Sequence, residues 1–320
     1  MKNKPIILVA GEPNSIFLEI FFKAIKFKKY NSPLILICCK KILLDQMKKN
    51  KFKKKINILE LHKLKKYSLD NNSINLIDVE CKKLNKNFNL NLTNKYLIAS
   101  FELALKLIKD KHSSKLINGP INKKSFLNKK FLGMTEYISD QYNVKKTGML
   151  IYNKKLSVVP LTTHLRIKDI PRHITSKLII QKIRSLDKEF KKIFKIKPKI
   201  GILGLNPHNA ELKKDSEEVK KIKPAILKLK NIGLNVTGPL VADTVFINNY
   251  KKYNVIVGMY HDQVLAPFKT LFHFNAINIT LGLNYLRVSP DHGPAFDLIR
   301  KNKANYSSLF ECIKFINSIN

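Results

Sequence analysis

The stretch VIVGMYHDQVLAPFK, residues 255–269, joins an apolar run to a group of polar side chains. Its first five residues are apolar, which is typical of a strand buried in a parallel sheet. A His-Asp-Gln triplet begins at His261, and Lys269 follows eight residues after that histidine. The stretch therefore predicts a strand with a polar end. That end either delivers a metal ligand and a cation to a site, or is the end of a buried strand that meets water.

Short apolar runs of this kind alternate with helix-like segments along the 320-residue chain. In 94–109, for example, Leu97, Phe101 and Leu105 recur at helical spacing. Such alternation indicates an α/β fold with a largely parallel sheet covered by helices. Residues 48–92 are rich in Lys and Asn and weakly periodic, so we expect them at the surface. The expected strands are 6–10, 34–38, 116–118, 156–161, 200–205, 255–259 and 276–280, and the expected helices are 16–27, 94–109, 176–190, 216–231 and 309–318.

The chain is strongly basic, with 60 Lys and Arg residues against 23 Asp and Glu and a formal net charge of +37. A balance of this kind can indicate nucleic-acid binding. The lysines are spread along the whole chain, however, with one local cluster at 48–55, and no RNP, zinc-finger or basic-zipper pattern occurs. Compositional drift explains the charge better, and nucleic acid is not expected as the main partner. A basic surface could still favour anionic metabolites.

The sequence also bears on the compartment. No apolar run approaches the ~20 residues that a membrane-spanning helix needs. The first run, 5–11, is too short for a signal peptide and lacks a small-residue cleavage pattern. Four cysteines show no CxxC spacing and are interpreted as buried free thiols in a reducing compartment. These are Cys38, Cys39, Cys81 and Cys312. We therefore expect a cytoplasmic protein.

Three of the eight histidines lie two or three residues past a predicted strand. LSVVPLTTH ends in His164, IGILGLNPH ends in His208, and VIVGMYH ends in His261. In open α/β sheets ligands collect beyond the carboxyl ends of the strands. Three imidazoles there could hold one divalent metal ion and leave positions open for substrate. Spacing alone cannot show that they converge, and a single histidine at a strand end is more often a hydrogen-bonded structural residue.

Other polar residues lie near predicted strand ends. GPLVADTVF contains Asp243, and NITLGLNYLRVSPDHG contains Arg287, Asp291 and His292. Lys269 and Arg287 make a pair of cations suited to a phosphate or a carboxylate. Taken singly, each of these residues is more often a turn residue or a surface charge. No GxGxxG follows the first strand, so the Rossmann dinucleotide fingerprint is absent.

Several motifs taken together carry a resemblance. They are, in chain order, GEPNS, NGPINKKSF, GMTEY, TTHLRIKDIP, LNPHNAE, GPLVADTVF, MYHDQ and NITLGLNYLRVSPDHG. Over residues 6–300 the set resembles the 4-hydroxythreonine-4-phosphate dehydrogenase family of pyridoxal-phosphate biosynthesis. The resemblance implies two α/β/α domains similar to those of isocitrate and isopropylmalate dehydrogenases, with approximate bounds 1–120 plus 280–320, and 121–279. It also implies a homodimer with the active site at the subunit interface.

The resemblance assigns cofactors and site residues as well. It implies NAD or NADP, and one divalent metal ion per site (zinc, magnesium or cobalt). The implied metal ligands are His164, His208 and His261, and the implied substrate-binding residues are Met134, Thr135, Lys269, Asn278 and Arg287. The candidates for the general base are Asp243, Asp291 and His292, with a structural role equally open for each. Met134 is a departure, because the family carries a histidine there and a thioether cannot donate a hydrogen bond.

The implied reaction is the oxidation of 4-phosphooxy-L-threonine to 2-amino-3-oxo-4-phosphooxybutanoate, which decarboxylates to 3-amino-2-oxopropyl phosphate. Met134 motivates one alternative, a dehydrogenase for another four-carbon phosphorylated hydroxy acid such as erythronate or threonate 4-phosphate. The charge of +37 motivates a second alternative, a non-catalytic basic protein that binds nucleic acid. The sequence leaves open the metal, the choice between NAD and NADP, and the general base.

Overall fold

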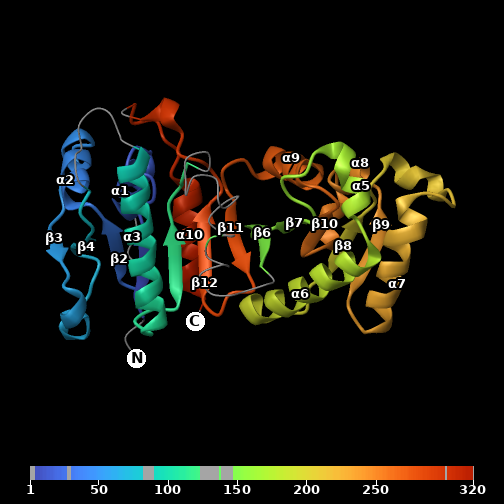
Figure 1. Cartoon of the computed structure of the whole chain (residues 1–320), viewed down its shortest axis with the longest axis horizontal. Helices are drawn as coiled ribbons and strands as arrows, with labels where there is room; N and C mark the ends of the chain where they lie inside the picture. Colours follow the sequence, from blue (N-terminus) through green and yellow to red (C-terminus); the bar gives the residue numbers. More distant parts are fainter. Residues whose placement is uncertain are drawn as a thin grey trace. The chain divides into compact units, whose positions relative to one another are not determined.

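The computed structural model describes residues 4–26, 30–81, 90–122, 137, 147–299 and 301–319. The chain divides into two compact units. The first unit comprises Met1–Lys145 and Leu283–Asn320, and the second comprises Lys146–Gly282. The domain bounds expected from the sequence, 1–120 plus 280–320 and 121–279, stay a prediction. Each unit is a sheet with helices packed on it, so the predicted α/β class is confirmed (Figure 1).

The first unit has a fully parallel sheet in the order β3-β4-β2-β1-β5-β12. Its central strands are rich in Ile, Leu and Val and are buried along nearly their whole length, as expected for strands covered on both faces. The strands are β1 (Ile6–Val9), β2 (Leu34–Cys38), β3 (Ile56–Ile58), β4 (Ile74–Asp78), β5 (Lys115–Asn118) and β12 (Leu286–Pro290).

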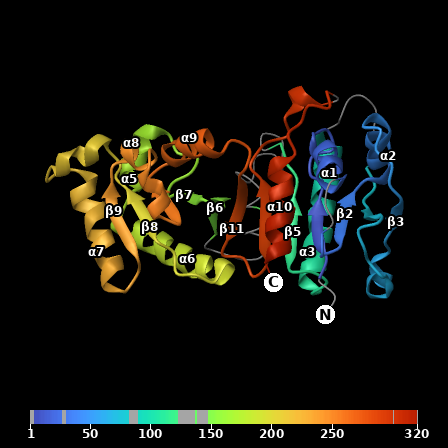
Figure 2. The same ribbon diagram turned by 180° about the vertical axis from the view of Figure 1, so that it is seen from behind.

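Helices cover both faces of this sheet. The helices are α1 (Phe17–Lys26), α2 (Lys40–Lys49), α3 (Leu90–Lys109) and α10 (Ser307–Ser318), with short turns η1 (Leu61–Lys66) and η7 (Phe296–Leu298). α3 packs on β1 and β2, and α10 packs on β5 and β12. Figure 1 shows α3 in front of the sheet, and Figure 2, from behind, shows α10 in front. The chain passes from β1 through α1 to β2, toward the β3 edge of the sheet, and from β4 through α3 back to β5, toward the β12 edge. Because both crossovers are right-handed, α1 and α3 lie on opposite faces of the sheet.

The second unit has a mixed sheet in the order β11-β6-β7-β10-β8-β9. β6 pairs antiparallel with β11 and β7, whereas β7, β10, β8 and β9 run parallel. The strands are β6 (Gly148–Asn153), β7 (Leu156–Pro160), β8 (Ile200–Leu203), β9 (Val236–Leu240), β10 (Val255–Gly258) and β11 (Ile277–Leu281). Because four neighbouring strands are parallel, their carboxyl ends share one edge of the sheet.

The longer helices of this unit are α6, α7 and α9. α6 begins where the Thr175 hydroxyl accepts a hydrogen bond from the Leu178 N–H at 3.1 Å, a typical N-cap. The helical segments are η3 (Ile167–Asp169), α5 (Ile170–His173), α6 (Ser176–Phe194), η4 (Pro207–Leu212), η5 (Glu218–Ile222), α7 (Lys223–Asn231), α8 (Ala242–Val245), η6 (Asn249–Lys252) and α9 (His261–Phe272).

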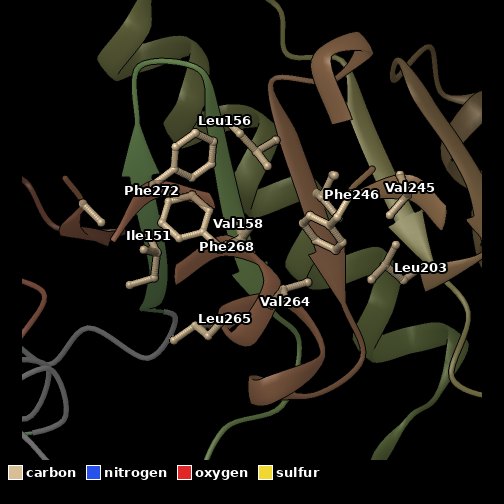
Figure 3. Close-up of a cluster of buried hydrophobic side chains, with 12 residues drawn as sticks. Ile151, Leu156, Val158, Leu203, Val245, Phe246, Val264, Leu265, Phe268 and Phe272 are labelled. Atoms are coloured by element: carbon tan, nitrogen blue, oxygen red, sulfur yellow. The ribbon is translucent and has the colours of Figure 1, made fainter. Parts of the chain in front are cut away.

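The core of the second unit forms where α9 packs on β7 and β10. Figure 3 shows the rings of Phe268 and Phe272 beside Leu156 and Val158. The two rings lie 4.8 Å apart between centroids. Burying each Phe side chain contributes about 1.5–3 kcal/mol. This packing fixes α9, which begins at His261.

Some expectations need correction and others hold. Residues 48–92 are not all at the surface, because Ile74, Leu76 and Ile77 of β4 are buried in the sheet. The four cysteines are buried and free, as predicted. Within the described part of the chain, no helix combines the length and the apolarity that crossing a membrane requires.

Candidate active site at the carboxyl edge of the second sheet

Three adjacent strands of the second unit lead into the three histidines. β10 lies between β7 and β8 and pairs in parallel with both. His164 follows β7, His261 follows β10, and His208 follows β8. All three histidines therefore come from the same edge of the sheet, the edge at which α/β proteins bind ligands.

The structure brings two of them together. The ring centroids of His164 and His261 lie 6.4 Å apart, with 30° between the ring planes. His164 is exposed, and the His261 side chain is 40% exposed. His261 Nδ1 lies 2.8 Å from Asp262 Oδ1. If the ring N–H donates to this carboxylate, Nε2 keeps its lone pair for a metal, an arrangement common around metal-binding histidines.

His208 is exposed on η4. No three His, Cys, Asp or Glu side chains among the described residues lie close enough together to hold a metal ion. The three-histidine site thus stays a prediction, of which the structure pairs two members. Both His164 and His208 have left-handed backbones, with φ of +57° and +48°. Non-glycine residues seldom adopt this region, and such residues gather at functional sites.

Gln263 links the strands on which two of the histidines depend. Its Oε1 accepts a hydrogen bond from the Met259 N–H at 2.7 Å, and its Nε2 donates to the Gly204 carbonyl at 2.8 Å. Met259 lies just past β10, and Gly204 lies just past β8. The Gln263 side-chain amide therefore connects the segment that leads to His261 with the segment that leads to His208.

The other predicted residues of this unit lie on nearby elements. Lys269 is exposed on α9. Asn278 lies on β11, and its buried Oδ1 has no hydrogen-bond partner among the described residues. Asp243 is exposed on α8, and α8 packs against η4, which carries His208.

The remaining predicted residues belong to the first unit or are not described. Arg287 on β12 is only 3% exposed, and its Nε donates to Asn118 Oδ1 at 2.8 Å. The Asp291 N–H donates to the Ser308 hydroxyl at 2.9 Å. His292 is half-buried. The predicted substrate-binding residues Met134 and Thr135 lie outside the described residues.

Two residues of the first unit were not predicted as site residues from the sequence. Asn118, at the end of β5, holds Arg287 as just described. Glu12, just past β1, is buried, and burial raises the pKa of its carboxyl group although the Asn122 N–H donates to it. β1 and β5 are neighbours at the point where the direction of the chain connections reverses, a usual ligand position. Applying the strand-end rule to these strands, as to the histidines, would have found both residues.

Two imidazoles paired at the carboxyl ends of parallel strands define an α/β protein with a ligand site at the sheet edge, the position of the active site in α/β enzymes. The family described as "Pyridoxal phosphate biosynthetic protein PdxA" matches residues 29–316. The chain belongs to this family, which confirms the resemblance seen in the motifs.

Individual relatives match this sequence over nearly its whole length. A 4-hydroxythreonine-4-phosphate dehydrogenase of Sulfurihydrogenibium sp. is 37% identical over 314 residues, which is 97% of this chain and 96% of the relative. One of Aquifex aeolicus is 35% identical over 322 residues, covering 99% and 98%. The crystal structure of the Klebsiella pneumoniae enzyme of that name matches with a TM-score of 0.84 and 26% identity, covering 98% of this chain and 97% of that one. The chain is accordingly an oxidoreductase of the dehydrogenase type, which implies a nicotinamide cofactor.

Proposed function

We propose that the chain oxidises 4-phosphooxy-L-threonine with NAD or NADP and a divalent metal ion. The product, 2-amino-3-oxo-4-phosphooxybutanoate, then decarboxylates to 3-amino-2-oxopropyl phosphate in pyridoxine 5'-phosphate biosynthesis, in the cytoplasm. The pairing of the His164 and His261 rings at the strand ends carries the proposal. The name shared by relatives of nearly full length supports the choice of substrate.

The residues present fit a divalent metal ion. His164 and His261 offer two neighbouring imidazoles open to solvent, and Asp262 orients the second of them. We propose His208, from the adjacent strand, as the third ligand. Neutral imidazoles suit Zn²⁺ and similar ions and leave the charge of the ion intact. A bound ion would lower the pKa of a coordinated hydroxyl group and stabilise negative charge on its oxygen.

The anionic substrate needs its own binding groups. We propose Lys269, Asn278 and Arg287, together with Met134 and Thr135. Asn278 fits because its buried Oδ1 can accept a hydrogen bond from a ligand. Arg287 fits because Asn118 holds its guanidinium group in one orientation. Such groups convert binding energy into orientation of the reacting carbon.

The general base would take the proton of the substrate hydroxyl. Asp243, Asp291 and His292 remain the candidates. Asp243 is favoured by its place on α8, which contacts the element that carries His208. Its exposed carboxylate is free to move toward a bound substrate.

A homodimer belongs to the same proposal. Ile167, three residues after His164, is 78% exposed, and Leu165 and Leu212, which follow His164 and His208 in the chain, are also exposed apolar side chains. Exposed apolar groups beside a site can mark a protein interface. We propose that a second copy covers this face, so that the active site lies at the subunit interface of a homodimer.

Purified protein tests the proposal directly. It should reduce NAD or NADP with 4-phosphooxy-L-threonine, lose this activity after treatment with EDTA, and regain it with Zn²⁺, Mg²⁺ or Co²⁺. Erythronate 4-phosphate serves as the comparison substrate. Absence of turnover with any of the restored metals would overturn the proposed reaction, and a preference for erythronate 4-phosphate would overturn the proposed substrate.

A further inference from the structure

His208 reaches the edge of the sheet on a segment without regular structure. Residues 204–206 connect β8 to η4, and the left-handed backbone continues from His208 to Leu212. Non-glycine residues seldom adopt this conformation. The contacts made by the residues just before it, 204–206, therefore bear on the direction in which the segment leaves the strand.

Glu218 makes the contacts that fix it. Its Oε1 accepts hydrogen bonds from the N–H groups of Leu205 at 2.7 Å and Asn206 at 2.8 Å. Its Oε2 accepts a third from the Asn206 side-chain amide at 3.0 Å. The two backbone donors belong to the residues directly before Pro207-His208. One carboxylate thus satisfies successive N–H groups that the sheet leaves without acceptors.

Glu218 is buried, and its carboxylate is committed to the hydrogen bonds from Leu205 and Asn206. The residue is 0% exposed, and in a chain of net charge +37 it forms no ion pair with a Lys or Arg among the described residues. Burial acts to raise the pKa of its carboxyl group, but the hydrogen bonds from Asn206 and Leu205 outweigh burial and hold the pKa below its ordinary value. Glu218 also opens η5, a single π-helical turn before α7, and such turns recur at functional sites.

We infer that Glu218 is a positioning residue for the metal site, because its carboxylate fixes the Leu205–Asn206 backbone and so the direction in which His208 projects. The inference rests on the proposed role of His208 as a metal ligand. It predicts that metal binding depends on a side chain that touches neither the metal nor the substrate.

Glu218→Gln is the test variant, because it replaces one accepting oxygen with an amide donor that faces other donors. Glu217→Gln is the matched control. Glu217 is the adjacent carboxylate; it accepts a hydrogen bond from the Asn206 side-chain amide at 3.0 Å, and among the described residues it accepts none from the loop backbone. Co²⁺ alone is the probe, since its absorption spectrum reports ligand geometry. Amide hydrogen exchange at Leu205 and Asn206 is measured on the same samples.

Glu218→Gln should weaken Co²⁺ binding about 10–100-fold, the usual loss when a group that orients a metal ligand is removed. Its Co²⁺ spectrum should change, and exchange at Leu205 and Asn206 should accelerate. Glu217→Gln should keep wild-type affinity within about threefold. If Glu218→Gln does not fold, Glu218→Asp, which keeps the charge but shortens the reach, should show the same direction of change.

Two results are distinguishable. If wild-type protein binds Co²⁺ and the Glu218 variants bind it equally well with the same spectrum, the positioning role is overturned while the proposed function stands. If wild-type protein binds no Co²⁺, the proposed metal site fails. The exchange measurement then still decides whether Glu218 fixes the loop. Equal exchange at Leu205 and Asn206 in the wild type and the Glu218 variants would show that it does not.

Discussion

Replacing Phe268 with Ala should both destabilise the second unit and weaken its metal site. Phe268 is 0% exposed and lies in the core between α9 and the sheet (Figure 3). Truncating a buried Phe to Ala typically costs about 3–5 kcal/mol, through lost transfer energy and the cavity left behind. This is a large part of the 5–15 kcal/mol that stabilises a typical domain. Because α9 begins at His261, metal affinity should fall as well.

Urea unfolding followed by circular dichroism gives the free energy of unfolding of each variant. Phe274→Ala is the matched control, because it makes the same change nearby at a side chain that is 54% exposed. The control should stay within about 0.5 kcal/mol of wild type. If Phe268→Ala loses less than about 1 kcal/mol, or no more than the control, the described packing of α9 is wrong.

Three further outcomes are expected. Asn118→Ala should lower the free energy of unfolding by about 1.5–3 kcal/mol, because it removes the acceptor for the Arg287 guanidinium, and should raise KM; an unchanged KM would separate Arg287 from substrate binding. The folded-state pKa of Glu218 lies below its ordinary value of 4.5, so the stability it contributes is present above about pH 4.5 and is lost as pH falls through the folded-state pKa. The difference in unfolding free energy between wild type and Glu218→Gln should therefore shrink on acidification, and a growing difference would contradict the sign. Met134→His should shift kcat/KM toward 4-phosphooxy-L-threonine over erythronate 4-phosphate, and unchanged preference would dismiss Met134 as the determinant.

Strands with uninterrupted apolar runs were predictable from the sequence. The bounds of β2 agree fully with the prediction, and β1, β7 and β10 end one residue early. β4 was missed because Asn75 interrupts its pattern. That Asn is buried, and its side-chain amide donates to the carbonyls of Leu34 and Asp70. A polar residue satisfied by backbone groups outside its own strand gives no sign of burial in the pattern of that strand.

The helix α9 was missed for a different reason. Val264, Phe268 and Phe272 recur every four residues, which is helical spacing. Pro267 lies among them, and a proline inside a helix removes one backbone hydrogen bond. The packing of the apolar face on β7 outweighs that loss. Tertiary burial decided the structure here against a local signal.

The candidate site, too, could be predicted from the sequence only in part. The position of each histidine after a strand could be predicted, because strand ends follow from apolar runs. The pairing of His164 with His261 could not, because it depends on β7 and β10 being neighbours in the sheet. Asn118 and Arg287 lie 169 residues apart in the chain, so no local pattern connects them.

Metal content tests the central claim most directly. The protein is stripped with EDTA, reloaded with Zn²⁺ and freed of excess metal, and bound zinc is counted per subunit in wild type and in the His164→Ala, His208→Ala and His261→Ala variants. Three ligands around one ion predict about one zinc per subunit in wild type and almost none in each variant, with circular dichroism unchanged. A variant that keeps a full equivalent of zinc at wild-type affinity would contradict the three-histidine site.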